Sequence, residues 1–253
     1  SMMQLVAVGA VFIWSGFVRS GLGFGGAVLS LPFLLLIHDD PIVFLPLIAI
    51  HLLIFSAWIA LTGYFSTRRQ DSASSIDWRY LKIALAIMFI PKLVGVFGLL
   101  TMPGVWMSTL IFIVVFAYAI GYVFNKPFKS NSRWLDAVFL MVGGYISGAS
   151  LIGAPLIVAV FAAHVSKLQL RDTLFVLWFI LVGIKALAFL LAGVDFQWMQ
   201  HLWLLPLVTL GHLLGQMFHR YLVRAETAVF YRVMGGMLLV ISTLGLVKTW
   251  LVL

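Results

Sequence analysis

The sequence has no cysteine and few charged residues. The absence of cysteine excludes disulfides, thiol chemistry and thiolate metal sites. Only 9% of the residues are charged, whereas an ordinary soluble domain carries about 25%. Hydrophobic residues make up 63% of the chain, and the mean hydropathy is +1.13. A soluble protein is therefore excluded, and the continuous apolar runs predict an all-α integral membrane protein whose backbone groups bond within helices.

Acidic residues are also scarce, and none of the eight lies in the middle of an apolar run. A pathway for sodium or a metal ion, built on carboxylates, is therefore disfavoured, and we expect no metal site and no cofactor. Basic or titratable residues do occur within apolar stretches, where charge is costly and usually functional. This imbalance favours an anion as the substrate. The residues concerned are Arg19, His51, Lys92, Lys185 and His212.

The apolar residues form eight segments within what we expect to be a single transmembrane domain, residues 1–253. A helix that crosses the hydrocarbon needs about 20 residues, so segments 2–37 and 135–164 are too long for one straight span. Glycines interrupt both, and we expect each to break there into two half-helices. The remaining segments are 42–64, 80–102, 105–124, 172–193, 198–223 and 227–253.

The two glycine-rich breaks resemble each other in sequence. Residues 20–27 align without gaps on residues 147–154. A weaker similarity pairs Gly95 in the third segment with Gly215 in the seventh. These matches indicate an internal duplication, for which a chance likeness between glycine-rich membrane helices is the alternative.

Basic residues beside the apolar segments predict the orientation of the chain. The net charge of +8 comes mostly from short loops, where it indicates a cytoplasmic location rather than nucleic-acid binding. Both flanks of the fifth segment are basic, so this segment must enter the membrane and return. The result is two inverted repeats, about 1–125 and 133–253, each a broken helical hairpin plus three transmembrane helices, as in many secondary transporters. A plain eight-helix bundle is the alternative.

Each break should expose backbone N–H groups where the following half-helix begins, and glycine lets an oxyanion approach them closely. Sulfonate, sulfite, phosphate and carboxylate all fit this chemistry. Arg19 is the leading candidate because it precedes the first break, where a guanidinium can hold an oxyanion by two hydrogen bonds; an arginine reaching the membrane interface is the alternative. The predicted substrate-binding residues are Arg19, Ser20, Gly21, Gly23, Gly25, Gly26, Ser147, Gly148, Ser150, Gly153, Lys92 and His212.

Proton coupling would need a titrating group within the membrane, for which His51 and His212 are the candidates. His212 takes the place of Lys92 when the two repeats are aligned. Structural roles stay open: an ion pair for Lys92, a core hydrogen bond for His51, and a side chain reaching the membrane edge for Lys185. The sequence has no HExxH or GxSxG motif and no intramembrane aspartate pair, so we expect neither catalytic residues nor an enzyme.

The stretch SGLGFGGAVLSLP, residues 20–32, resembles the glycine-rich motif of the sulfite exporter TauE/SafE family, also called the 4-toluene sulfonate uptake permease family. The stretch SGASLIGAP, residues 147–155, is similar to the second copy of this motif, and residues 211–215 agree as well. The resemblance covers the whole chain. It departs from the family pattern where the second glycine run is thinned at residues 149–151 and where Gln216 replaces a basic residue.

This resemblance implies a multi-pass transporter in the bacterial inner membrane. The implied substrate is sulfite or an organosulfonate such as sulfoacetate, taurine or isethionate, bound between the two broken hairpins and moved by alternating access. The expected partners are this anion and the lipid bilayer, with a homodimer open as the oligomeric state. Two other functions stay open: a membrane enzyme or assembly subunit acting on a sulfur or lipid-borne substrate, and a passive anion channel.

Overall fold

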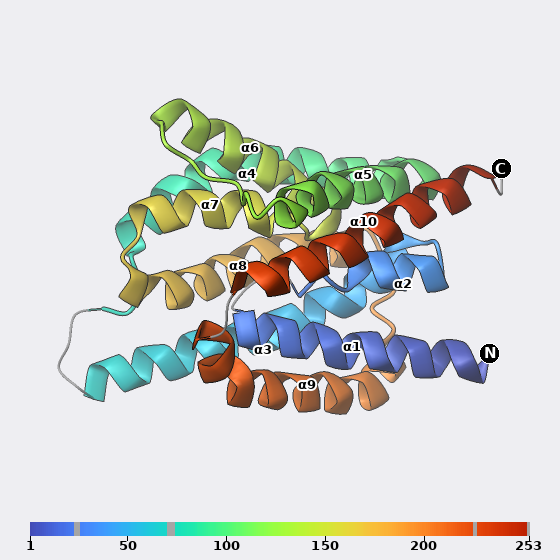
Figure 1. The fold of residues 1–253 in the computed structure, drawn as a ribbon, viewed down its shortest axis with the longest axis horizontal. Coiled ribbons are helices and arrows are strands. Elements are labelled where there is room, and N and C mark those ends of the chain that lie inside the picture. Colours follow the sequence, from blue (N-terminus) through green and yellow to red (C-terminus); the bar gives the residue numbers. More distant parts are fainter. Residues whose placement is uncertain (23–25, 70–73, 225–226, 252–253) are drawn as a thin grey trace. The chain divides into compact units, whose positions relative to one another are not determined.

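The computed structural model describes residues 1–22, 26–69, 74–224 and 227–251. Within these ranges the chain forms ten α-helices and no strand, which confirms the expected all-α fold (Figure 1). The helices are α1 (Met2–Leu22), α2 (Leu31–Ile37), α3 (Pro41–Arg69), α4 (Trp78–Thr101), α5 (Gly104–Val123), α6 (Arg133–Ser150), α7 (Ala154–His164), α8 (Lys167–Leu191), α9 (Trp198–Arg224) and α10 (Thr227–Leu251).

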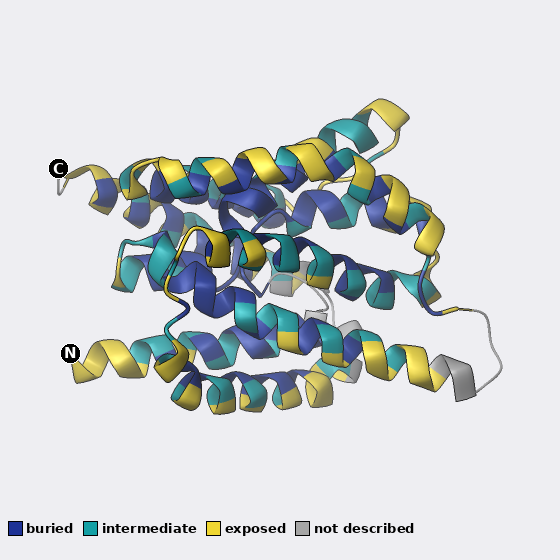
Figure 2. Ribbon diagram, turned by 180° about the vertical axis from the view of Figure 1, so that it is seen from behind, coloured by how far each residue is buried: buried dark blue, intermediate teal, exposed yellow. Residues whose placement is uncertain are grey.

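Seven of the described helices are long and apolar enough to cross a membrane: α1, α3, α4, α5, α8, α9 and α10. Their sequences are apolar around most of the circumference, so each buries one face and leaves large hydrophobic side chains exposed on another (Figure 2). Phe97, Leu191 and Leu202 are examples of such exposed side chains. Surfaces of this kind are stable against lipid rather than water. The chain is a multi-pass membrane protein.

Both long apolar segments are broken, as the sequence predicted. In the first, α1 ends at Leu22 and α2 begins at Leu31. In the second, α6 ends at Ser150 and α7 begins at Ala154. Leu151 takes a left-handed backbone conformation with φ of 62°, which ends α6 and redirects the chain.

The described helices belong to two compact units. In unit 1, α1 packs against α9, and α10 packs against α5 and α2. In unit 2, α4 packs against α6, and α8 contacts α4, α6 and α7. Each unit draws helices from both halves of the sequence, so the units do not coincide with the proposed repeats, which stay a prediction. Unit 1 consists of Ser1–Leu45, Met102–Pro127 and Phe196–Leu253, and unit 2 of Pro46–Thr101 and Phe128–Asp195.

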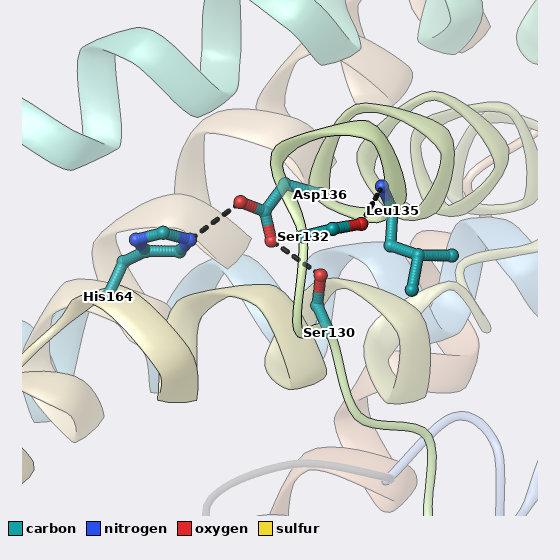
Figure 3. Close-up of polar contacts among 5 residues, drawn as sticks. All are labelled: Ser130, Ser132, Leu135, Asp136 and His164. Carbon is teal, nitrogen blue, oxygen red and sulfur yellow. Dashed lines mark hydrogen bonds and ion pairs between the residues drawn. The ribbon is translucent and has the colours of Figure 1, made fainter.

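In unit 2, the hairpin of α6 and α7 is closed at its outer end by polar contacts (Figure 3). His164 Nε2, at the end of α7, lies 2.7 Å from Asp136 Oδ2 in the first turn of α6. The Ser130 hydroxyl donates to Asp136 Oδ1 at 2.5 Å, and the Leu135 N–H donates to Ser132 Oγ at 3.2 Å. Because the start of α6 meets the end of α7, the two helices run antiparallel and their outer ends lie on the same side of unit 2.

The length of α7 decides how this hairpin enters the membrane. Its 11 residues extend about 16 Å, against a hydrocarbon core of about 30 Å. By its length, α7 is therefore too short to cross the hydrocarbon core alone. The His164–Asp136 pair holds the ends of the hairpin together but stabilises it little, because an ion pair with a partly exposed member contributes less than about 1 kcal/mol.

Candidate functional site

Glycines bring the backbones of α4 and α6 into contact in unit 2. A Cβ atom at Gly148 of α6 would overlap the carbonyl group of Lys92. A Cβ atom at Gly95 of α4 would overlap the carbonyl group of Tyr145. Gly148 therefore lies inside α6 and serves the helix crossing, rather than breaking the helix. This close approach places the side chain of Lys92 beside Ser147, in the last turn of α6.

Two buried lysines meet at Ser147. Lys92 directly follows Pro91 inside α4, and its side chain is fully buried. Its Nζ donates to the Ser147 hydroxyl at 2.9 Å and to the Ser147 carbonyl at 3.1 Å. Lys185 of α8 is also fully buried, with its Nζ 3.5 Å from the same carbonyl oxygen and 5.7 Å from the centre of the Phe189 ring. Two amines from different helices thus converge on one residue of the broken hairpin.

Sequence reasoning singled out Lys92 and Ser147 for the substrate site but not Lys185. A lysine within an apolar helix also fits a side chain that reaches the membrane edge, and this alternative kept Lys185 out of the predicted set. The structure excludes the alternative because no part of the Lys185 side chain is exposed. The sequence feature that could have identified Lys185 is the absence of any acidic residue within one helical turn of it on α8.

A positive charge on either lysine would have no carboxylate close by to balance it. No carboxylate among the described residues lies within 4 Å of either amine. Because both amines contact one carbonyl oxygen, at 3.1 and 3.5 Å, they lie at most about 6.6 Å apart, and two positive charges at this distance or less would repel by about 2.5 kcal/mol or more at an effective dielectric constant of 20. The C-terminal end of α6 offsets only part of this positive charge, because the C-terminal end of a helix carries about half a negative charge. A bound anion would relieve both the repulsion and the cost of burying the lysines.

The chain between α6 and α7 folds back onto α6. A Cβ atom at Gly153 would overlap the carbonyl group of Gly143 and lie 3.1 Å from the Ser147 nitrogen. The first backbone N–H groups of α7 follow this turn directly, where they lack partners within the helix. Ser150 is directed elsewhere, because its hydroxyl donates to the Ile146 carbonyl at 2.9 Å. Of the two predicted serine donors on this hairpin, only Ser147 contacts a lysine.

Unit 1 has a matching construction where α1 crosses α9. A Cβ atom at Gly215 of α9 would overlap the hydroxyl of Ser20. The Ser20 hydroxyl donates to the carbonyl oxygen of His212 at 2.7 Å. In the expected alignment, Ser20 matches Ser147 and His212 matches Lys92. Each unit therefore pairs the serine of its glycine motif with the residue three positions before the crossing glycine.

His212 and Gly21 are held by further side chains of α9. The Gln216 side chain lies 3.2 Å from His212 Nε2, so the amide can donate to this ring nitrogen. His219 Nδ1 donates to the carbonyl oxygen of Gly21 at 2.7 Å. Gln216, which departs from the family pattern, thus contacts the histidine that sequence reasoning placed in the site.

Arg19 is buried where the chain folds back onto α1. Only 2% of its side chain is exposed, so it does not extend to the membrane interface. A Cβ atom at Gly26 would lie 3.1 Å from the Arg19 Cβ, and the carbonyl oxygen of Gly26 accepts a hydrogen bond from the Ser15 hydroxyl at 3.5 Å. Because α2 begins only at Leu31, Gly26 lies before this helix and not at its first turn, whereas the sequence suggested that the glycine amides start the second half-helix.

The described site residues thus fall into two groups, one in each unit. His51 of α3 is buried in unit 2, as are the residues around Ser147. Gly23 and Gly25 lie outside the described residues. Unit 1 contains Arg19, Ser20, Gly21, Gly26 and His212, and unit 2 contains His51, Lys92, Ser147, Gly148, Ser150 and Gly153.

Comparison with known proteins gave one family match. The family model described as sulfite exporter TauE/SafE matches residues 8–244. This range includes both breaks and every predicted site residue. The search of curated proteins found no match, and neither did the search of solved structures.

Proposed function

The chain belongs to the sulfite exporter TauE/SafE family of transporters, and from this premise we propose that it moves a small sulfur-containing anion across the membrane by alternating access. The proposed substrates are sulfite and organosulfonates such as sulfoacetate, taurine and isethionate. The proposed location is the bacterial inner membrane.

The observation that carries this proposal is the burial of Lys92 against Ser147, at the end of a broken helix. Helix ends inside a membrane domain are where transporters of this general plan bind charged substrates. No carboxylate lies within 4 Å of the Lys92 amine among the described residues, so an ion pair within the protein does not account for its burial. A sulfonate or sulfite group supplies the missing negative charge and several acceptor oxygens.

Arg19 is proposed as a further substrate contact, with Ser20 and the backbone amides of Gly21 and Gly26. Its burial supports this role, because an arginine is rarely enclosed within a membrane domain unless its charge is used. A guanidinium holds a sulfonate group by parallel hydrogen bonds. Arg19→Gln, added to the thermal-stability measurement below, tests this contact separately: loss of the anion-dependent shift supports it, and an unchanged shift excludes it.

Thermal stability of the purified protein tests anion binding. The panel contains sulfite, thiosulfate, sulfoacetate, taurine, isethionate, sulfate and simple carboxylates. An anion at one hundred times its dissociation constant should stabilise the folded protein by about 2.7 kcal/mol. The shift should disappear in Lys92→Gln and persist in Lys82→Gln, which removes an exposed lysine from the same helix. If no anion stabilises the wild type, an enzyme or an assembly subunit becomes the better proposal.

Proton coupling through histidine is a second testable part of the proposal. His51 and His212 are both buried, and imidazole changes charge close to neutral pH. If either carries the coupled proton, uptake driven by an inward pH gradient should fall to the rate without a gradient in the double variant His51→Gln/His212→Gln. The measurement is initial uptake at several external pH values. Unchanged pH dependence in this variant would exclude histidine coupling.

A further inference from the structure

We infer that Lys92 and Lys185 form a two-cation site that selects anions with two negative charges. The inference rests on the proposed function, because it names the substrate class of the same transporter. Lys185 was not among the residues predicted from sequence, and the family match alone assigns it no role.

The geometry makes the two lysines neighbours. Both Nζ atoms contact the carbonyl oxygen of Ser147, at 3.1 and 3.5 Å. The distance between the two Nζ atoms therefore cannot exceed the sum of these two distances. A small dianion such as thiosulfate or sulfoacetate carries acceptor atoms on opposite sides, each able to accept a hydrogen bond from one amine. One such anion can therefore contact both amines.

The two lysines have more N–H donors than Ser147 uses, so donors remain for a ligand. Each ammonium group has three N–H donors. Ser147 receives three contacts from the two groups together, two from Lys92 and one from Lys185. The oxygen atoms of a sulfur anion are suitable acceptors for the remaining N–H donors. The buried side chain of Leu181, one turn before Lys185 on α8, offers none.

Charge balance then separates the members of the proposed substrate class. A dianion neutralises both lysines, whereas a monoanion leaves one positive charge buried and uncompensated. A zwitterion such as taurine brings an ammonium group of its own, which both lysines repel. The site should therefore prefer sulfoacetate to isethionate, and isethionate to taurine, although the three share a two-carbon skeleton.

A structural role for Lys185 is the alternative, since lysines commonly bind the last carbonyl groups of a helix. Lys92 already donates to the Ser147 carbonyl, so the end of α6 does not need a second cation. A capping role also predicts a different result. Replacement of a capping lysine would lower the stability of the protein without changing its preference among anions of different charge.

The test is equilibrium binding of sulfoacetate, isethionate and taurine to the purified full chain, for the wild type and for Lys185→Gln. In the wild type, sulfoacetate should bind roughly tenfold or more tightly than isethionate, a difference that corresponds to one uncompensated charge. In Lys185→Gln, sulfoacetate should weaken by roughly tenfold while isethionate changes little, so that the preference is lost. Lys167→Gln, at an exposed position of the same helix, is the matched control and should keep the preference.

Two results would overturn the inference: equal affinity of the wild type for sulfoacetate and isethionate, or equal weakening of both ligands in Lys185→Gln. The wild-type comparison decides the matter even if Lys185→Gln does not fold. Lys185→Arg, which keeps the charge, should retain the preference for sulfoacetate. These results are distinct from a failure of the proposed function, in which no sulfur anion binds to the wild type at all.

Discussion

Replacing Lys92 with glutamine should abolish uptake of the sulfur anion while the protein still inserts and folds. Lys92 contributes the amine closest to Ser147, and glutamine keeps most of the side-chain volume without the charge. Removing one member of a buried, hydrogen-bonded charge interaction typically costs about 2–5 kcal/mol. This corresponds to a loss of affinity of roughly thirtyfold to several thousandfold. Initial uptake rates in proteoliposomes, at equal protein content, measure the effect.

The control for this prediction is Lys82→Gln, which removes an exposed lysine from the same helix and should leave uptake close to that of the wild type. Lys92→Arg should retain part of the activity, because it preserves the charge but changes the donor geometry. Wild-type uptake and affinity in Lys92→Gln would show that the lysine serves the structure alone.

Substituting Gly148 by alanine should lower the stability of the protein strongly. The added Cβ would overlap the backbone carbonyl of Lys92, so α4 and α6 would have to separate along their whole crossing. Overpacking of this kind costs typically about 1–3 kcal/mol, and more where backbone rather than a side chain must move. The melting temperature in detergent and the fraction of monodisperse protein measure the loss.

Gly183→Ala in α8 is the matched substitution for this experiment. A Cβ atom at Gly183 would lie 3.9 Å from a methyl group of Leu53, which is an ordinary contact. Alanine also has the higher helix propensity, by about 1 kcal/mol. Gly183→Ala should therefore be neutral or stabilising. Equal melting temperatures for the two variants would contradict the close helix crossing at Gly148.

The sequence predicted the helical breaks because length and glycine content act locally. A run of 36 residues cannot form one span, and glycines mark where it can turn. The same signal misleads at Gly148, which lies inside α6. Glycine serves both chain reversal and close helix packing, and only the three-dimensional contacts distinguish the two uses.

The structure brings two of the predicted site residues together, and their role in binding stays a prediction. Lys92 and Ser147 are in contact. Their spacing in the sequence could suggest this contact only through the proposed duplication. The approach of Lys185 could not be predicted, because it depends on how α8 packs against α6. The hydrogen bond from the Ser150 hydroxyl to the Ile146 carbonyl could not be predicted either, because it depends on where α6 ends.

The two units make contacts at positions that match in the proposed internal duplication, which stays a prediction; in unit 1 the serine bonds a backbone carbonyl and in unit 2 a side-chain amine. Ser20 contacts His212 in unit 1, and Ser147 contacts Lys92 in unit 2, at positions that match in the alignment of the repeats. Both crossings also use a glycine three residues later, Gly215 or Gly95. The matched positions differ in chemistry, one holding an imidazole and the other an amine. The opposite orientation of the two repeats stays a prediction.

Counterflow of a radiolabelled sulfur anion in proteoliposomes tests the central claim most directly. Vesicles containing the purified protein are loaded with unlabelled sulfoacetate, sulfite or thiosulfate, and entry of the labelled anion from outside is followed over time. A carrier that binds its substrate at Lys92 should give saturable, transient accumulation for at least one of these anions, and none in Lys92→Gln. Entry without saturation or exchange would indicate a channel, and no protein-dependent entry of any sulfur anion would contradict the proposed transport function.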